Sequence, residues 1–232
     1  MPPDRESLIE HISKADGIFS LLTERIDEAI IESSPSLKVI SNMAVGTDNI
    51  DVASATRHNI PVGNTPGVLT ETTADFAFSL LISSSRRIVD ADNYVRAGHW
   101  KTWGPSILLG RDLFGATLGI IGYGEIGQAM ARRATGFNMK ILYNRRTPIE
   151  PIDGINASYA TVDQILLQSD FVSLHVPLTP DTRHMIGARE LSLMKDSAIL
   201  INTARGPVVD QEALVEALRA GRPERAAIDV TN

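Results

Sequence analysis

The sequence predicts an α/β protein in which helices cover parallel sheets. This prediction rests on three observations. Short apolar runs typical of strands alternate along the chain with helical patterns. A glycine-rich turn, Gly122 to Gly127, follows one apolar run and opens a helical stretch. Several apolar runs end in glycine or polar residues, and ligands bind at the carboxyl ends of strands in open α/β sheets.

The first third of the chain alternates short elements. We predict helices over 4–14, 25–31 and 51–57, and strands over 17–22, 37–41 and 60–62. Pro66-Gly67 marks a loop, and apolar residues at mostly helical spacing then predict one long helix over 69–98. This part reads as a partial α/β domain followed by a linking helix.

From Thr117 the alternation of strand and helix resumes. We predict strands at 117–121, 139–143, 170–175, 198–202 and 226–230, with helices near 125–136, 161–168, 188–194 and 210–220. Thr161 with Gln164 forms a potential capping box, Asp210 is a helix cap and Gly221 a helix end. This pattern predicts a doubly wound parallel sheet of the Rossmann type.

The ends of the chain suggest a piece of a longer protein. The sequence stops at Asn232 directly after a predicted strand, although a doubly wound sheet of the usual order needs a sixth strand. It also enters on a helix rather than on the strand that normally begins an α/β domain. We therefore expect a fragment that lacks an N-terminal strand and a C-terminal segment.

Composition excludes several classes of function. A net charge of −6 argues against a protein that binds nucleic acid by neutralising phosphates. The absence of cysteine excludes disulfides, thiolate catalysis and cysteine-ligated metals, and no histidine or carboxylate spacing suggests another metal site. No apolar run is long enough to span a bilayer and no signal peptide is evident, so we expect a cytoplasmic protein without a membrane partner.

The glycine turn predicts a site for the phosphates of a dinucleotide. Gly122 permits the tight turn from strand to helix, Gly124 lets the backbone approach a pyrophosphate, and Gly127 allows close packing of helix and strand. The helix that follows presents free N–H groups to the anion. Such a glycine pattern alone is weak evidence, and its place between a strand and a helix strengthens it.

The end of the next strand bears on the choice of cofactor. An NAD-selective site places Asp or Glu there for the ribose hydroxyls, whereas this chain has Asn144, Arg145 and Arg146. Guanidinium groups bind phosphate well, so we predict a preference for NADP(H) while NAD(H) stays open. The alternative is that the two arginines are ordinary solvated surface residues.

Arg205 is the candidate for chemistry. It follows the apolar strand that ends in Asn202, at the same sheet edge as the glycine turn, where a guanidinium would bind a carboxylate and polarise a neighbouring carbonyl. Val45-Gly46 lies in a turn whose backbone N–H groups would bind the same carboxylate, although alone it is typical of any glycine turn. We expect His175 to have a structural or cofactor-lining role, and Asp229 either to accept a hydrogen bond from the nicotinamide amide or to act as a cap.

An ordered set of motifs then resembles a known family. The chain is similar to the D-isomer-specific 2-hydroxyacid dehydrogenases, and within them most like the glyoxylate/hydroxypyruvate reductases. The resemblance covers almost the whole chain. Its matching segments are Leu37 to Ser41, Val45 to Asp48, Thr65 to Thr70 with Thr72 to Ala74, Gly122 to Gly127, His175 to Thr179, Asn202 to Gly206 and Ala227 to Thr231.

The resemblance implies roles for individual residues. The backbone of Val45 and Gly46 would contact the carboxylate of a small 2-oxo or 2-hydroxy acid, and Arg205 would bind and polarise it. The implied cofactor contacts are Glu125, Ile126, Asn144, Arg145, Arg146, Pro177, Thr203 and Asp229. The family also implies a homodimer, an active site in a cleft between domains, and this division: a partial, flavodoxin-like substrate domain over 1–68, a linking helix over 69–98 and an NAD(P)-binding domain over 99–232.

One departure from the family concerns its acid machinery. The family has a Glu shortly after the segment matching Asp229 to Thr231 and a His further on, and both would lie beyond Asn232. On this ground we expect the chain alone to be impaired or inactive. Two alternatives stay open: an NAD-dependent phosphoglycerate- or lactate-type dehydrogenase, and a non-catalytic, nucleotide-sensing protein like the corepressors of the same fold.

Overall fold

The computed structural model describes residues 3–150 and 152–231 of the chain. The chain folds into two compact units, Met1–Leu69 and Thr70–Asn232. We call them unit 1 and unit 2 and describe each by itself. Both consist of parallel strands with helices, so the α/β class predicted from the sequence is confirmed.

Unit 1 is a three-stranded parallel sheet with its helices. The strands, in the order β1-β2-β3, are β1 (Gly17–Ser20), β2 (Val39–Asn42) and β3 (Val62–Gly63). The helices are α1 (Arg5–Ile12), α2 (Glu28–Glu32) and α3 (Val52–Arg57). Each begins at an aspartate, Asp4, Asp27 or Asp51, whose carboxylate accepts a backbone N–H of the first turn. Isoleucines such as Ile30 and Ile40 fill the core between these elements.

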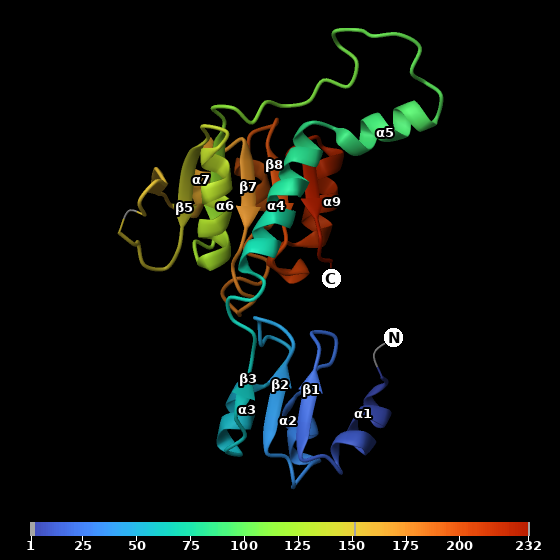
Figure 1. Cartoon of the computed structure of the whole chain (residues 1–232), viewed down its shortest axis with the longest axis vertical. Helices are drawn as coiled ribbons and strands as arrows, with labels where there is room; N and C mark the ends of the chain where they lie inside the picture. Colours follow the sequence, from blue (N-terminus) through green and yellow to red (C-terminus); the bar gives the residue numbers. More distant parts are fainter. Residues whose placement is uncertain (1–2, 151, 232) are drawn as a thin grey trace. The chain divides into compact units, whose positions relative to one another are not determined.

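Unit 2 contains a six-stranded parallel sheet in the order β6-β5-β4-β7-β8-β9 (Figure 1). The strands are β4 (Thr117–Ile121), β5 (Lys140–Asn144), β6 (Ala157–Tyr159), β7 (Phe171–Leu174), β8 (Ile199–Asn202) and β9 (Arg225–Ile228). The helices are α4 (Thr70–Ser85), α5 (Ile88–Arg96), α6 (Glu125–Thr135), α7 (Val162–Gln168), α8 (Ala188–Leu193) and α9 (Gln211–Arg219), with a short 3-10 helix η1 (Gly206–Val208). This order, which reverses between β4 and β7, is that of a doubly wound sheet.

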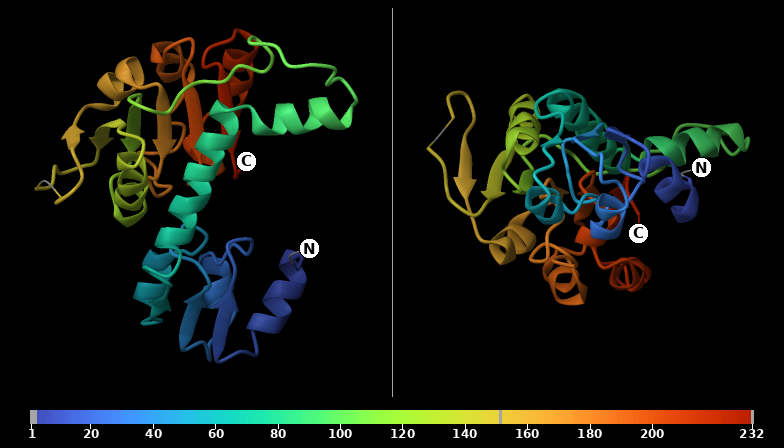
Figure 2. Two further views of the ribbon diagram at one scale, coloured as in Figure 1. Left: turned by 45° about the horizontal axis from the view of Figure 1, so that its top comes forward. Right: turned by 90° about the horizontal axis from the view of Figure 1, so that it is seen from below.

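Helices cover both faces of this sheet (Figure 2). α4 and α6 pack on one face over a core that includes Leu118 and Ile120, and α7, α8 and α9 pack on the other over Val172 and Leu200. The central strands are buried on both sides, which explains why their sequences are continuous apolar runs. The predicted caps are confirmed: Thr161 and Gln164 form a capping box, and Asp210 caps α9.

The sixth strand was not found by sequence reasoning. We expected it beyond the end of the chain, but it is β6, between β5 and α7, and it pairs with β5 at the edge of the sheet. Its side chains are exposed or half-buried, because an edge strand of three residues needs no apolar run. The six strands of a doubly wound sheet are therefore present in unit 2, and β6 is the strand that the sequence did not reveal.

The single linking helix predicted over 69–98 is instead two helices, α4 and α5. Arg87 between them adopts a left-handed conformation with φ of 56°. The carbonyl of Ser85 accepts the N–H of Arg111 at 2.7 Å, so a distant segment ends α4 by taking one of its hydrogen bonds. A Cβ on Gly110 would lie 2.2 Å from the same carbonyl oxygen, so only glycine permits this approach. α5 and the segment after it then extend away from the sheet (Figures 1 and 2).

Candidate functional site

The predicted cofactor residues lie at one edge of the sheet in unit 2. Strand pairing places Asn144, Ile121, Leu174, Asn202 and Ile228 next to one another in a single row across β5, β4, β7, β8 and β9. The residues that follow this row are Arg145, Gly122, His175, Thr203 and Asp229. The fold therefore brings to the carboxyl ends of five adjacent strands the segments that the sequence identified separately.

The three glycines of the turn meet different physical demands. Gly122 has φ of +99°, and a Cβ there would lie 2.4 Å from the carbonyl carbon of His175. A Cβ on Gly127 would lie 2.3 Å from the carbonyl oxygen of Gly122, so the helix packs closely on the turn. A Cβ on Gly124 would meet no atom within 4 Å. Gly124 therefore leaves open space beside the backbone, as close approach of a pyrophosphate requires.

The N-terminus of α6 is available to an anion. Gly124 is its N-cap, and no side chain caps it among the residues that the structure describes. The helix has 11 residues, so its dipole and the free N–H groups of Glu125 and Ile126 favour a bound phosphate. The geometry of the turn and the open helix end both fit a dinucleotide.

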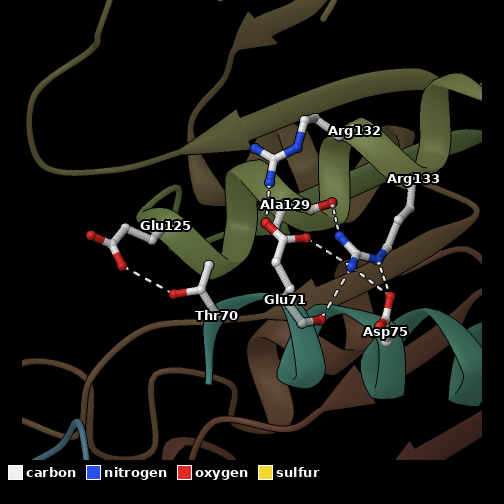
Figure 3. A network of polar contacts seen from close by, with 7 residues as sticks. All are labelled: Thr70, Glu71, Asp75, Glu125, Ala129, Arg132 and Arg133. Atoms are coloured by element: carbon white, nitrogen blue, oxygen red, sulfur yellow. Dashed lines mark hydrogen bonds and ion pairs between the residues drawn. The ribbon is translucent and has the colours of Figure 1, made fainter. Parts of the chain in front are cut away.

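Glu125 does not point its carboxylate across this helix end. Its Oε2 accepts a hydrogen bond of 3.0 Å from the hydroxyl of Thr70, the first residue of α4 (Figure 3). A carboxylate left beside the helix N-terminus would repel a pyrophosphate, and Thr70 gives it another partner. Nothing in the sequence around Thr70 pointed to this contact, because the two residues are 55 positions apart.

The end of β5 presents two arginines. The Asn144 backbone carbonyl accepts the N–H groups of Gly122 and Tyr123 at 3.0 and 3.2 Å, and its side-chain amide donates to the carbonyl of Ala160. Asn144 thus holds the turn in place. Within residues 3–150 and 152–231, neither Arg145 nor Arg146 forms a hydrogen bond or an ion pair, so both guanidinium groups keep their donors for a ligand.

The end of β8 positions Arg205. The buried side chain of Asn202 accepts the N–H of Ala204 and donates to the carbonyl of Arg205, both at 3.0 Å, so one amide shapes the whole turn. Arg205 in turn donates to the carbonyl of Ala204 at 2.8 Å. The Thr203 hydroxyl is buried without a partner in the described part of the chain. A buried hydroxyl with no partner costs free energy unless a bound group satisfies it, which fits a cofactor at this edge.

His175 and Pro177 continue the edge at the end of β7. Nε2 of His175 lies 2.9 Å from the Ser173 hydroxyl, and burial lowers the pKa of His175 to about 4. The imidazole is therefore neutral at pH 7, which agrees with a lining role rather than an ionic one. Thr182 donates to the carbonyl of Pro177 at 2.6 Å and fixes this segment.

Asp229 lies outside β9, at the end of the sheet row. Its N–H donates to the carbonyl of Asn202 at 3.0 Å, while its side chain is exposed. The Asp229 carboxylate accepts no hydrogen bond from any residue that the structure describes, so the alternative role as a cap finds no support. Within the described residues, the Asp229 carboxylate is therefore open to accept a hydrogen bond from an amide group of a ligand.

Val45 and Gly46 belong to unit 1, in the loop between β2 and α3. Val45 is exposed and Gly46 is half-buried. Sequence reasoning found these two residues but missed Asn42 and Asn64, whose side chains donate to the carbonyls of Gly46 and Val45. The one available signal was Asn42 itself, an amide at the end of a strand where apolar residues are expected.

Among residues 3–150 and 152–231, no group of three or more His, Asp or Glu side chains is placed to hold a metal ion. In that same part, no helix combines the length and apolar character needed to cross a membrane.

The turn at Gly122 to Gly127, the open start of α6 and the order of the strands define a dinucleotide-binding protein. The family model described as "D-isomer specific 2-hydroxyacid dehydrogenase, NAD binding domain" matches residues 78–232. The chain belongs to the D-isomer specific 2-hydroxyacid dehydrogenases, as the motifs predicted.

Individual relatives support this membership. A glyoxylate reductase of Korarchaeum cryptofilum is 53% identical over 99% of this chain and 70% of its own length. Among solved structures, a glyoxylate reductase from Paecilomyes thermophila has a TM-score of 0.88 at 38% identity, covering 98% of this chain and 72% of that one. A D-lactate dehydrogenase from Aquifex aeolicus, complexed with NAD and lactic acid, has a TM-score of 0.91 at 33% identity, covering 97% and 67%.

Proposed function

We propose that the protein is a glyoxylate reductase-like oxidoreductase that reduces a small 2-oxo acid, glyoxylate or hydroxypyruvate, to glycolate or D-glycerate. The observation that carries this proposal is the row of strand ends, which gathers the glycine turn, the two arginines after β5 and Arg205 at one sheet edge. Two relatives that are 53% and 52% identical to this chain are named glyoxylate reductases, which supports the choice of acid.

The bound nicotinamide would supply the hydride, and the chain would supply binding and orientation. Gly124 and the start of α6 would hold the pyrophosphate, and Thr203, Pro177 and Asp229 would line the rest of the cofactor. Arg205 would bind the acid with its guanidinium and draw electron density from the carbonyl that is reduced. In unit 1, backbone N–H groups of the loop at Val45 and Gly46 would bind the carboxylate.

NADPH is the proposed cofactor. Arg145 and Arg146 keep their donors unused within the described residues and follow the strand end where a 2′-phosphate would lie. No carboxylate stands at positions 144–146 to repel that phosphate. NADH, the form suggested by the lactate dehydrogenase relative, stays the alternative.

We also propose a homodimer that forms through unit 2. Helix α5 buries none of its residues, and its exposed apolar side chains include Ile88, Val89 and Val95. A helix with this composition gains from contact with a second apolar surface. Analytical ultracentrifugation tests the proposal: a dimer is expected, and Val89→Asp is expected to shift it toward monomer. The cytoplasmic location stays a prediction.

Steady-state reduction of a panel of 2-oxo acids by the natural full-length protein tests the activity. We expect glyoxylate and hydroxypyruvate to be reduced with NADPH, and pyruvate and phosphohydroxypyruvate to be poorer substrates. A preference for pyruvate or phosphohydroxypyruvate with NADH would favour the lactate- or phosphoglycerate-type alternative. Tight cofactor binding without turnover of any 2-oxo acid would favour the nucleotide sensor.

A further inference from the structure

The loop between β2 and α3 has an unusual distribution of hydrogen bonds. Four consecutive backbone carbonyls, those of residues 44–47, are all bound. Ala44 accepts the N–H of Thr65 at 2.9 Å, and the carbonyl of Thr47 accepts the N–H of Ile50 at 3.0 Å. The two carbonyls between them are bound by side chains.

The two side chains are the amides of Asn42 and Asn64, which lie at the ends of two different strands. Asn64, after β3, donates to the Val45 carbonyl, and Asn42, the last residue of β2, donates to the Gly46 carbonyl, both at 2.8 Å. Asn42 is 1% exposed, and its other amide hydrogen goes to the side chain of Asn49 at 3.1 Å. Asn49 in turn donates to backbone carbonyls of the loop after β1 at 2.9 and 3.0 Å.

The N–H groups of the same loop are unused. Those of Val45, Gly46 and Thr47 make no hydrogen bond with any residue in the described ranges, 3–150 and 152–231. In a trans peptide the C=O and N–H groups point in opposite directions. Fixing the carbonyl of Val45 therefore fixes the direction of the Gly46 N–H, and fixing that of Gly46 fixes the Thr47 N–H.

We propose that Asn64 and Asn42 are positioning residues which hold the Gly46 and Thr47 N–H groups ready for the carboxylate of the substrate. This inference deepens the proposed function and rests on it for the identity of the acid. The two amides need not touch the substrate. They hold two peptide groups in one orientation, so that binding an anion requires little reordering of the loop.

Asn64 carries the test because its side chain is exposed and its loss leaves the buried network of Asn42 intact. Asn64→Leu keeps the approximate shape and removes the donor without adding charge. Ser36→Ala is the matched control: Ser36 is also exposed in unit 1 and donates to a backbone carbonyl, that of Ala15, at 3.1 Å.

The experiment is an amide NMR titration of the natural full-length protein with oxamate, an unreactive analogue of 2-oxo acids, in the presence of NADPH. In the wild type, oxamate is expected to shift the amide signals of Gly46 and Thr47. In Asn64→Leu the dissociation constant is expected to rise by about fivefold, the loss of roughly one hydrogen bond, while signals outside this loop keep their positions. Ser36→Ala should bind as the wild type does.

Two results would overturn the proposal: oxamate that leaves the Gly46 and Thr47 signals unmoved in the wild type, or equal affinity of the wild type and Asn64→Leu. The readout does not depend on turnover. A wild type that fails to reduce 2-oxo acids, yet binds oxamate at these amides with the expected loss in Asn64→Leu, would refute the proposed activity and support the positioning role. Asn64→Ala provides a second variant if Asn64→Leu does not fold.

Discussion

The glycines of the β4–α6 turn have separate roles, since Gly127 serves the packing of the fold and Gly124 leaves space for a ligand. A methyl group on Gly127 would collide with the Gly122 carbonyl, whereas one on Gly124 would enter open space. Because Gly124 has an extended conformation with φ of −84°, alanine fits its backbone.

Substitution at these two glycines therefore has different expected results. Gly124→Ala should leave the melting temperature within about 2 °C of the wild type and weaken NADPH binding by about tenfold or more, since the methyl group occupies the space the pyrophosphate needs. Gly127→Ala should lower both the melting temperature and the affinity for NADPH. Thermal melts and fluorescence titration with NADPH measure the two quantities. Equal loss of thermal stability in both variants would contradict this assignment.

We expect Arg145 and Arg146 to determine the choice between the two nicotinamide cofactors. Arg145→Ala and Arg146→Ala should each raise the dissociation constant for NADPH by about tenfold and change that for NADH by less than about twofold, because only NADPH carries the 2′-phosphate. Titrations of both cofactors with each variant test this. Arginines that belong merely to the solvated surface would leave the ratio of the two affinities unchanged.

At the scale of elements, α4 and α6 are joined by ion pairs and hydrogen bonds (Figure 3). Nε of Arg133 donates to Asp75 at 2.7 Å, and its other nitrogens donate to the carbonyls of Ala129 and Glu71 at 2.8 and 3.1 Å. The Arg133 side chain is only 20% exposed, and its hydrogen bond to Ala129 is partly buried, so solvent screens this bond less than the ion pairs with Glu71 and Asp75. Arg132, by contrast, is half exposed and pairs with the Glu71 carboxylate.

These two arginines provide a matched pair of variants. Arg133→Met keeps most of the apolar stem and should reduce the free energy of unfolding by about 1–2 kcal/mol, since it removes a part-buried hydrogen bond to the Ala129 carbonyl together with the contacts to Glu71 and Asp75. Arg132→Met should cost about 0.5 kcal/mol or less, as exposed ion pairs do. Urea denaturation measures both values. A similar loss of the free energy of unfolding in the two variants would show that the different burial of Arg132 and Arg133 does not affect stability.

The sequence predicted elements with strong apolar periodicity and missed those defined by tertiary contacts. The central strands, such as β4 and β8, are buried on both faces and were predicted from continuous apolar runs. β6 escaped because an edge strand buries little. The break after Ser85 escaped because the apolar pattern continues through Ile88 and Val89, and only the approach of Gly110 ends the helix.

The sequence likewise predicted those residues of the candidate site that have a local signal and not those that depend on contacts between distant segments. Glycines and strand ends have local sequence signals, so the sequence alone predicts the turn, Arg145, Arg146 and Arg205 as site residues. Thr70, Asn42 and Asn64 act through contacts between segments that are distant in the sequence or unmarked by any pattern, as with the bond from Asn64 to Val45, 19 positions away. Such pairs become visible only when the fold places the strand ends together.

At the scale of the whole molecule, stability should depend on pH through His175. Because burial lowers its pKa to about 4 from 6.5, the folded protein keeps the imidazole neutral where the unfolded chain takes up a proton. The free energy of unfolding should therefore fall as the pH drops from about 6.5 to about 4, by at most about 3 kcal/mol from this group, and this contribution should not change further below about pH 4.

The variant His175→Gln should remove this dependence between pH 6.5 and 4, whatever its stability at neutral pH, because glutamine does not titrate. Chemical denaturation at several pH values, for the wild type and the variant, measures the slope. Identical slopes for the two proteins would show that His175 takes up its proton equally in the folded and unfolded states.

We propose that the row of strand ends in unit 2 supports direct hydride transfer from a nicotinamide cofactor to a small 2-oxo acid bound by Arg205. The most direct measurement is mass spectrometry of the product formed by the natural full-length protein from glyoxylate and NADPH that carries deuterium at both C4 positions of the nicotinamide. We predict deuterium in the glycolate, and loss of most of this product in Arg205→Leu while NADPH still binds. Glycolate without deuterium, or full activity in Arg205→Leu, would contradict the account.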